Sequence, residues 1–205
     1  MGVYRRYQWN FRGVNFQYEI TWPQDIVDVL KEERHDITKT SEYGWYVRND
    51  PFQDVLIQFL DEIIDLGRKN LDLSRNKDLL HYLLSFVQHF RYYKDRGGEY
   101  PRYPSETVVD RGGDCEDSAI LMAFIAIKLG YRCAFLGFRN EGFLGIGRWA
   151  HVDLGIAPSS DGEFDGSYWT GDDGTEYFYA SCNGAHWKIG QFNGRFGDKA
   201  RVYPV

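Results

Sequence analysis

One stretch of the chain, residues 114–130, constrains the fold more than any other, because its centre is apolar on every side of a helix. Residues 119–127 (AILMAFIAI) form the longest unbroken apolar run in the sequence. A helix that is apolar all round lies buried in the middle of a domain. The run is also far too short to cross a bilayer. Gly130 then provides a helix stop. We therefore expect a central helix over 114–129 with the other elements packed around it.

Before this helix the pattern indicates a hairpin and further helices, and after it the pattern indicates strands. Aromatic and polar residues alternate on both sides of Arg12-Gly13, which predicts a β-hairpin with one aromatic face. Helices are predicted over 25–33, 51–67 and 74–90, with irregular chain over 35–49 and a Tyr/Pro-rich crossing over 97–113. Strands are predicted over 132–138, 150–156, 176–182 and 200–203. Helices first and strands second favour an α+β fold over a βαβ sheet.

Length and composition narrow the class of protein. The 205 residues suit a single domain, with 1–50 as an N-terminal hairpin and extension and 51–205 as the core. Aromatic residues make up 17% of the chain, which argues against disorder. The net charge of −6 disfavours nucleic acid as a partner. With no apolar leader or membrane segment we expect a soluble cytoplasmic protein, although a domain cut from a larger exported protein has the same features. The oligomeric state is left open.

Only one of the three cysteines lies in a chemical context. Cys133 and Cys182 are expected in the core, and an odd number of cysteines without a CxxC pair fits neither a disulfide framework nor a zinc site. Cys115 falls in the first turn of the central helix, where free N–H groups and the helix dipole stabilise a thiolate and can hold an oxyanion. Gly112 and Gly113 allow a close approach of backbone and substrate.

Three carboxylates flank this cysteine. Asp114, Glu116 and Asp117 are expected to point to solvent, and their negative charge raises the pKa of a nearby thiol. We expect the helix N-terminus and a histidine base to outweigh them. The preferred base is His151, which opens the alternating strand AHVDLGI, and the second choice is His186 in a glycine-flanked turn. His81 is expected on the surface.

At this point the residues resemble a known family. The segments GGDCEDSAILMAFIAIKLGY, AHVDLGI and EYFYASCNGAHWKIG are similar, in this order, to the archaeal and bacterial branch of the transglutaminase-like superfamily. The upstream stretches FVQHFRYYKD and YPRYPSETVVDRGG are also similar, so the resemblance covers roughly residues 86–190. It implies a papain-like core, in which the helix that carries the cysteine packs on an antiparallel sheet. It also implies a Cys–His–acid triad with Cys115 and His151.

The third member of this triad is where the sequence departs from the family. Similar sequences carry a carboxylate where this one has Ser181, so we expect Ser181, or Asn183 on the same strand face, to hold the His151 ring. Asp153 shares a face with His151 but is expected to be poorly placed to reach the ring. In some bacterial members the carboxylates around the cysteine bind calcium. The match of Asp114, Glu116 and Asp117 is too short to assign a metal, and no cofactor is expected.

Three functions follow from the resemblance. The first is a peptidase or amidase that acts on a peptide or protein substrate through an acyl-thioester at Cys115. The second is cross-linking, which uses the same acyl-enzyme with an amine as acceptor. The third is a non-catalytic binding module that keeps the fold with a degraded triad. Ser181 favours the third function, whereas the intact Cys115 and His151 favour the first.

Overall fold

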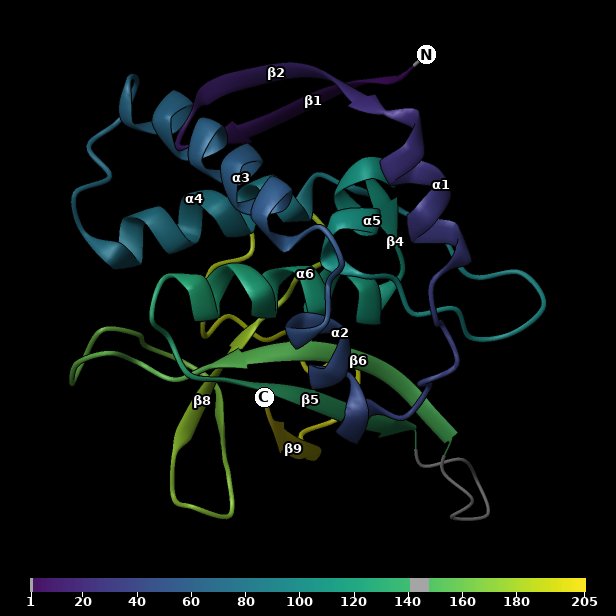
Figure 1. The fold of residues 1–205 in the computed structure, drawn as a ribbon. Coiled ribbons are helices and arrows are strands. Elements are labelled where there is room, and N and C mark those ends of the chain that lie inside the picture. The colour runs from purple at the N-terminus through teal and green to yellow at the C-terminus, as the bar shows by residue number, and fades with distance from the viewer. Residues whose placement is uncertain (1, 141–147) are drawn as a thin grey trace.

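The structure, a computed structural model, describes residues 2–140 and 148–205, with backbone alone for residues 139, 140 and 148–150. Figure 1 shows the layers: the hairpin lies over α3 and α4, the helix α6 lies beneath them, and the main sheet lies under α6. The fold is therefore α+β, as predicted. One continuous core runs from Tyr7 in the hairpin to Ile189 near the C-terminus.

The N-terminal hairpin forms as predicted, from β1 (Gly2–Phe11) and β2 (Val14–Pro23). Its two turn residues, Arg12 and Gly13, have φ values of 50° and 80°. Positive φ at both positions matches the right-handed twist of a two-residue hairpin. Tyr7 on the aromatic face is buried, and its hydroxyl donates to the Val108 carbonyl at 3.0 Å. The hairpin is thereby fixed to the helical layer.

The predicted helices are present with small shifts at their ends. They are α1 (Gln24–Glu32), α3 (Gln53–Arg68), α4 (Asn76–Gln88) and the central α6 (Cys115–Lys128). From Glu116 to Ala126, every residue of α6 is buried. Because α4 and α5 cover one side of α6 and strands β5 and β6 cover the other, its apolar circumference is buried up to Ala126, and Ile127 in the last turn is exposed.

Two helices were not predicted, α2 (Gly44–Arg48) and α5 (Pro104–Asp110). The segment that contains α5 reads as a Tyr/Pro crossing, and no residue near α5 in sequence caps its start. Asp50 provides the missing partner: its carboxylate accepts from Ser105 N at 2.7 Å and from Ser105 Oγ at 2.6 Å. This cap lies 55 residues away in sequence, so local pattern could not reveal it.

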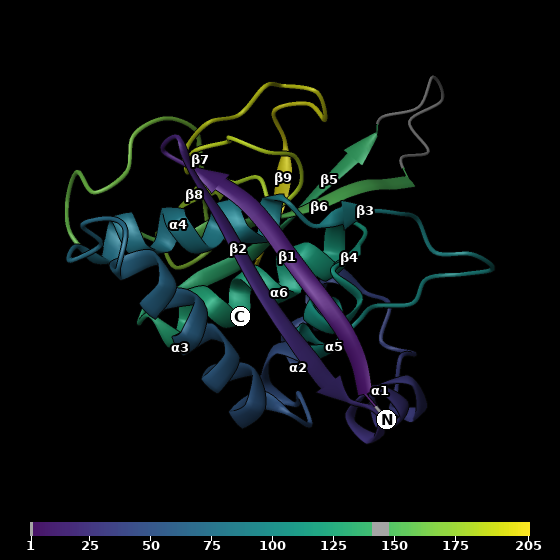
Figure 2. The ribbon, with the colours of Figure 1, turned by 90° about the horizontal axis from the view of Figure 1, so that it is seen from above.

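The main sheet is antiparallel, with the strand order β7-β8-β6-β5-β9. Its strands are β5 (Cys133–Asn140), β6 (Arg148–Ile156), β7 (Tyr168–Thr170), β8 (Glu176–Ala180) and β9 (Ala200–Pro204). Leu154 pairs with Ala180, so the two strands predicted to lie in one sheet are direct neighbours. A short parallel pair, β3 (Arg91–Tyr92) with β4 (Gly112–Gly113), lies at the start of α6 (Figure 2). Among the described residues, no helix has the length and apolarity needed to span a membrane.

Candidate functional site

Cys115 is the first residue of α6, as predicted, and its position is fixed from both sides. On the N-terminal side, Gly112 pairs with Arg91, and a Cβ atom on Gly112 would lie 2.2 Å from the Arg91 carbonyl oxygen. Glycine is therefore required there by the pairing of two strands, rather than by the approach of a substrate. On the C-terminal side, Asp114 N donates to Asp117 Oδ2 at 3.0 Å, which closes the first turn.

His151 lies on β6 and is held by a carboxylate of the same strand. Its Nε2 lies 2.7 Å from Asp153 Oδ2. The expectation that Asp153 cannot reach the ring is therefore wrong. Asp153 is fully buried and accepts two further hydrogen bonds, from Tyr179 Oη at 2.6 Å and from Cys182 N at 2.8 Å. The position of the carboxylate is thus set by β8 and by the chain that follows it.

Neither predicted partner of the ring holds it. Ser181 Oγ donates to the Asn183 carbonyl at 3.2 Å, and Asn183 Oδ1 accepts from Ser118 Oγ at 3.1 Å. The assignment of Ser181 or Asn183 as the residue that holds His151 is therefore wrong, since both side chains stabilise the chain after β8. The i, i+2 spacing of His151 and Asp153 is the feature of the sequence that indicates this contact, because it places both side chains on one strand face.

Cys115 and His151 line one cavity of about 730 Å³. Val152, the next residue after His151, belongs to the core beneath α6, so strand alternation sends His151 to the opposite face of the sheet. There the ring stacks on Phe196, with centroids 3.9 Å apart. Within the part of the chain that the structure describes, no hydrogen bond joins Cys115 Sγ to the His151 ring. The predicted contact is therefore absent in this conformation.

The thiol instead donates to Glu116 Oε2 at 3.2 Å. Burial and the adjacent Glu116 charge raise the pKa of the Cys115 thiol well above its usual range, although a hydrogen bond from the Val152 backbone opposes them. The expectation of a lowered thiol pKa is wrong in this state. It assumed that the neighbouring carboxylates point to solvent.

Those carboxylates are buried. The exposed fractions of Asp114, Glu116 and Asp117 are 9%, 3% and 0%. Arg102 is the cation that pairs with Asp117: its guanidinium Nη1 donates to Asp117 Oδ2 at 2.5 Å. Burial nevertheless raises the pKa of Asp117 to about 7. The sequence cannot show that the loop around Arg102 covers these acids.

Among the described residues, no cation forms an ion pair with Glu116 or Asp114. Burial is the main cause that raises the pKa of Glu116 to about 11, and hydrogen bonds with Asp114 and Glu99 add to it. Burial also raises the pKa of Asp114. Asp114 Oδ1 and Glu116 Oε1 are buried and accept no hydrogen bond from the described residues. Two orphaned acid oxygens in one cluster are costly unless something pairs with them.

A divalent cation fits this cluster. Carboxylate oxygens of Asp95, Asp114 and Glu116 all lie within 4.8 Å of one another. The donor set is oxygen only, which suits a hard cation such as Ca²⁺. Asp114 and Glu116, the two residues with an orphaned buried oxygen, both belong to this set. Asp95, from the loop between β3 and α5, ends the family-like stretch FVQHFRYYKD but was not singled out as a site residue, because it lies 19 residues before Asp114.

The other cysteines and His186 do not line the Cys115 cavity. Cys133 and Cys182 are buried in the core, as predicted. His186 lies in a different cavity from Cys115, which leaves His151 as the histidine of this site. A comparison of the chain with models of known families, with curated proteins and with solved structures finds no match.

Proposed function

We propose that the chain is a cysteine amidase or peptidase of transglutaminase-like type, with Cys115 as nucleophile, His151 as base and Asp153 as the acid that orients the base. The observation that carries the proposal is a buried His–Asp pair in the same cavity as a cysteine at a helix N-terminus. The sequence resemblance supports the same roles for Cys115 and His151. A base that is oriented by a third group is the general arrangement of activated nucleophiles.

The tautomer of the histidine follows from its partner. Because the Asp153 carboxylate accepts from Nε2–H, the other ring nitrogen, Nδ1, is left with its lone pair and acts as the base. For reaction, the thiol leaves Glu116, and the sulfur and this nitrogen approach each other within the cavity that both residues line. Hydrogen bonds of catalytic groups are often long in the free enzyme and tighten with substrate bound.

The reaction then proceeds through an acyl-enzyme. The thiol proton moves to His151 Nδ1 as the sulfur attacks the amide carbonyl carbon and forms a C–S bond. The oxyanion is stabilised by N–H groups at the start of α6. The C–N bond breaks, and the leaving amine takes the proton from His151. Water, deprotonated by the same nitrogen, then cleaves the thioester and releases the carboxylic acid and the thiol. An amine in place of water gives cross-linking.

Asp95, Asp114 and Glu116 would hold a divalent cation, and this cation would supply positive charge near the sulfur, which would offset the opposition of these carboxyls to an anion there. The residues of the chain carry out every bond-making step.

A second candidate function is a binding module without catalysis. The observation that favours it is the bond from the Cys115 thiol to Glu116 in place of His151, together with the raised thiol pKa. In this case the cavity retains a peptide and no acyl-enzyme forms.

The test is turnover of a peptide mixture, followed by mass spectrometry, with a fluorescent amine present to detect cross-linking. The reduced protein is measured with Ca²⁺ and with chelator. We expect Cys115→Ala to abolish product and Asp153→Asn to lower kcat by several orders of magnitude, as in other triads. The matched control His186→Ala should keep full activity.

Two results separate the functions. Turnover that survives Cys115→Ala contradicts the proposed nucleophile. Peptides that bind without a trapped thioester or product support the binding module. A loss of activity in Ser181→Ala, with Asp153→Asn unaffected, returns the orienting role to Ser181, just after β8.

A further inference from the structure

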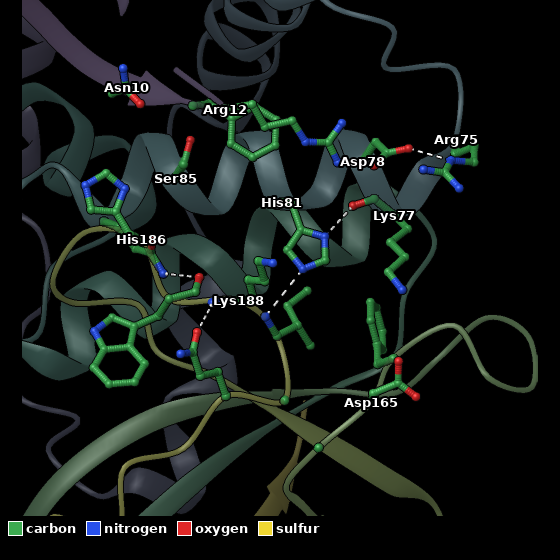
Figure 3. Close-up of a pocket in the computed structure, with 18 residues that line it drawn as sticks. Asn10, Arg12, Arg75, Lys77, Asp78, His81, Ser85, Asp165, His186 and Lys188 are labelled. Atoms are coloured by element: carbon green, nitrogen blue, oxygen red, sulfur yellow. Dashed lines mark hydrogen bonds and ion pairs between the residues drawn. The ribbon is translucent and has the colours of Figure 1, made fainter. Parts of the chain in front are cut away.

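A second cavity, larger than the one with Cys115, lies between the turn of the hairpin and α4. Its volume is about 910 Å³. Four segments line it: the hairpin turn, α4, residues 164–166 and residues 186–191 (Figure 3). It shares no lining residue with the Cys115 cavity. Its volume falls within the range of small-molecule sites.

The base of this cavity is pre-formed. His81 is half-buried, contrary to the expectation that it lies on the surface, and both ring nitrogens are engaged. Nδ1–H donates to the Lys77 carbonyl at 2.9 Å, and Nε2 accepts from Ile189 N at 3.4 Å (Figure 3). Gln88 Nε2 donates to the carbonyls of Ser181 and Trp187, which fixes the wall. These hydrogen bonds therefore hold this part of the lining in place before a ligand binds.

The charge of the lining is opposite in sign to the charge of the chain. Two arginines and two lysines line the cavity, against two aspartates, whereas the net charge of the chain is −6. Asp78 is already neutralised by Arg12 and Arg75. Lys188 is exposed, and its ammonium has no partner among the described residues. Lys77 Nζ donates to the Glu163 carbonyl, so among the described residues Lys188 is the lining cation whose charged group is left without a partner.

Aromatic rings supply the apolar part. Phe11, Phe164 and Trp187 all line the cavity. Phe164 is almost fully buried, with the Lys77 ammonium 5.8 Å from its ring centroid. The indole N–H of Trp187 donates to none of the described residues. An aromatic ligand body fits between such rings, and an acidic group on it fits the cationic rim.

We propose that this cavity binds a small ligand that has an aromatic body and a carboxylate or phosphate group. The volume favours a small molecule, the three rings favour an aromatic body, and the exposed Lys188 ammonium, with cations in excess over carboxylates in the lining, favours an anion. The site is independent of the chemistry at Cys115.

The test uses phenyl phosphate as the probe, with benzyl alcohol and benzylamine as neutral and cationic counterparts. Binding is followed by the amide chemical shifts of residues 186–191 in NMR spectra of the full chain. For a ligand of this size we expect a Kd on the order of 0.1–1 mM. The neutral probe should bind at least tenfold more weakly and the cationic probe not detectably. Affinity should fall as salt is added.

Matched charge reversals assign the site. Lys188→Glu should weaken phenyl phosphate binding about tenfold, because an exposed cation becomes an anion at the rim. Lys69→Glu makes the same change at an exposed position outside the cavity and should leave the affinity unchanged. Cys115→Ala should also bind as the unmodified chain does.

Three outcomes overturn the proposal. These are no shift change at saturating phenyl phosphate, equal binding of benzyl alcohol, and equal weakening by the two lysine variants. A short peptide of Glu and Phe that binds in the same cavity more than tenfold tighter than phenyl phosphate assigns the cavity to a polypeptide instead of a small ligand.

Discussion

Replacing Glu116 by glutamine removes an ionisable group from the buried cluster beside Cys115 and keeps its shape. Glu116 is 3% exposed, and no lysine, arginine or histidine forms an ion pair with it among the described residues. Its pKa is raised from the ordinary value of 4.5 to about 11, chiefly by burial and then by Asp114 and Glu99. The folded protein therefore keeps the carboxyl protonated at neutral pH, whereas the unfolded chain ionises it.

The sign of the effect on stability follows from this difference. A group whose pKa is higher in the folded state stabilises fully below its unfolded pKa, and that contribution is lost as pH rises towards the folded pKa. Between pH 4.5 and pH 7.5 the loss is about three pH units, or about 4 kcal/mol at most. Relaxation of the site and entry of water reduce this, so we expect on the order of 2–4 kcal/mol. Glutamine does not titrate and avoids the loss.

The assay is thermal unfolding with chelator present, at about pH 5 and about pH 8. We expect Glu116→Gln to match the unmodified chain at the lower pH and to exceed its Tm by about 5–10 °C at the higher pH. Ca²⁺ should raise the Tm of the unmodified chain and have little effect on the variant. Glu62→Gln, at an exposed position on α3, is the matched control and should show neither effect.

One outcome would refute the reasoning. If Glu116→Gln is less stable than the unmodified chain at the higher pH in chelator, Glu116 is ionised and compensated in the folded state. The cluster would then not have the uncompensated acid that the cation site depends on.

Three further changes have defined outcomes. At neutral pH without added cation, Cys115 should react with iodoacetamide more slowly than a free cysteine, because its thiol pKa is raised; a faster rate, measured by mass spectrometry, would contradict this. Gly112→Ala should destabilise by about 2 kcal/mol or more in urea unfolding, since the new Cβ meets the Arg91 carbonyl; an unchanged midpoint would show that the β3–β4 pair can separate freely. Arg102→Met leaves Asp117 buried without its cation, and should cost about 3–5 kcal/mol at pH 8 and less at pH 5, where Asp117 is protonated; equal losses at both values would rule out a charged pair.

The elements that the sequence predicted are those whose signal is local. The hairpin follows from aromatic alternation around Arg12-Gly13, and α6 follows from an apolar run with a glycine stop. Both patterns lie within a dozen or so consecutive residues, and neither depends on a distant partner. The prediction that β6 and β8 lie in one antiparallel sheet came with the family resemblance, and the structure has them as direct neighbours.

The elements that were missed depend on distant partners. Helix α5 starts where Asp50 caps Ser105, and the acids around Cys115 are buried because Arg102 and the loop before α5 cover them. A run of charges next to a cysteine is normally solvated, so burial of Glu116 contradicts the ordinary expectation. Only the tertiary structure shows that these carboxyls meet each other in place of water.

For Asp153, the strand face was predicted correctly and the contact with the His151 ring was not. Residues i and i+2 of a strand share a face, so the face was predicted correctly. The expectation that a neighbour on the same strand is poorly placed to reach the ring is the part that fails. Side chains on strands lean along the strand, and here Tyr179 on β8 and the amide of Cys182, two residues after β8, hold Asp153 in position. Position 181 can therefore be serine without leaving the His151 ring unpartnered: the carboxylate comes from β6, and β8 contributes the Tyr179 hydroxyl that fixes it.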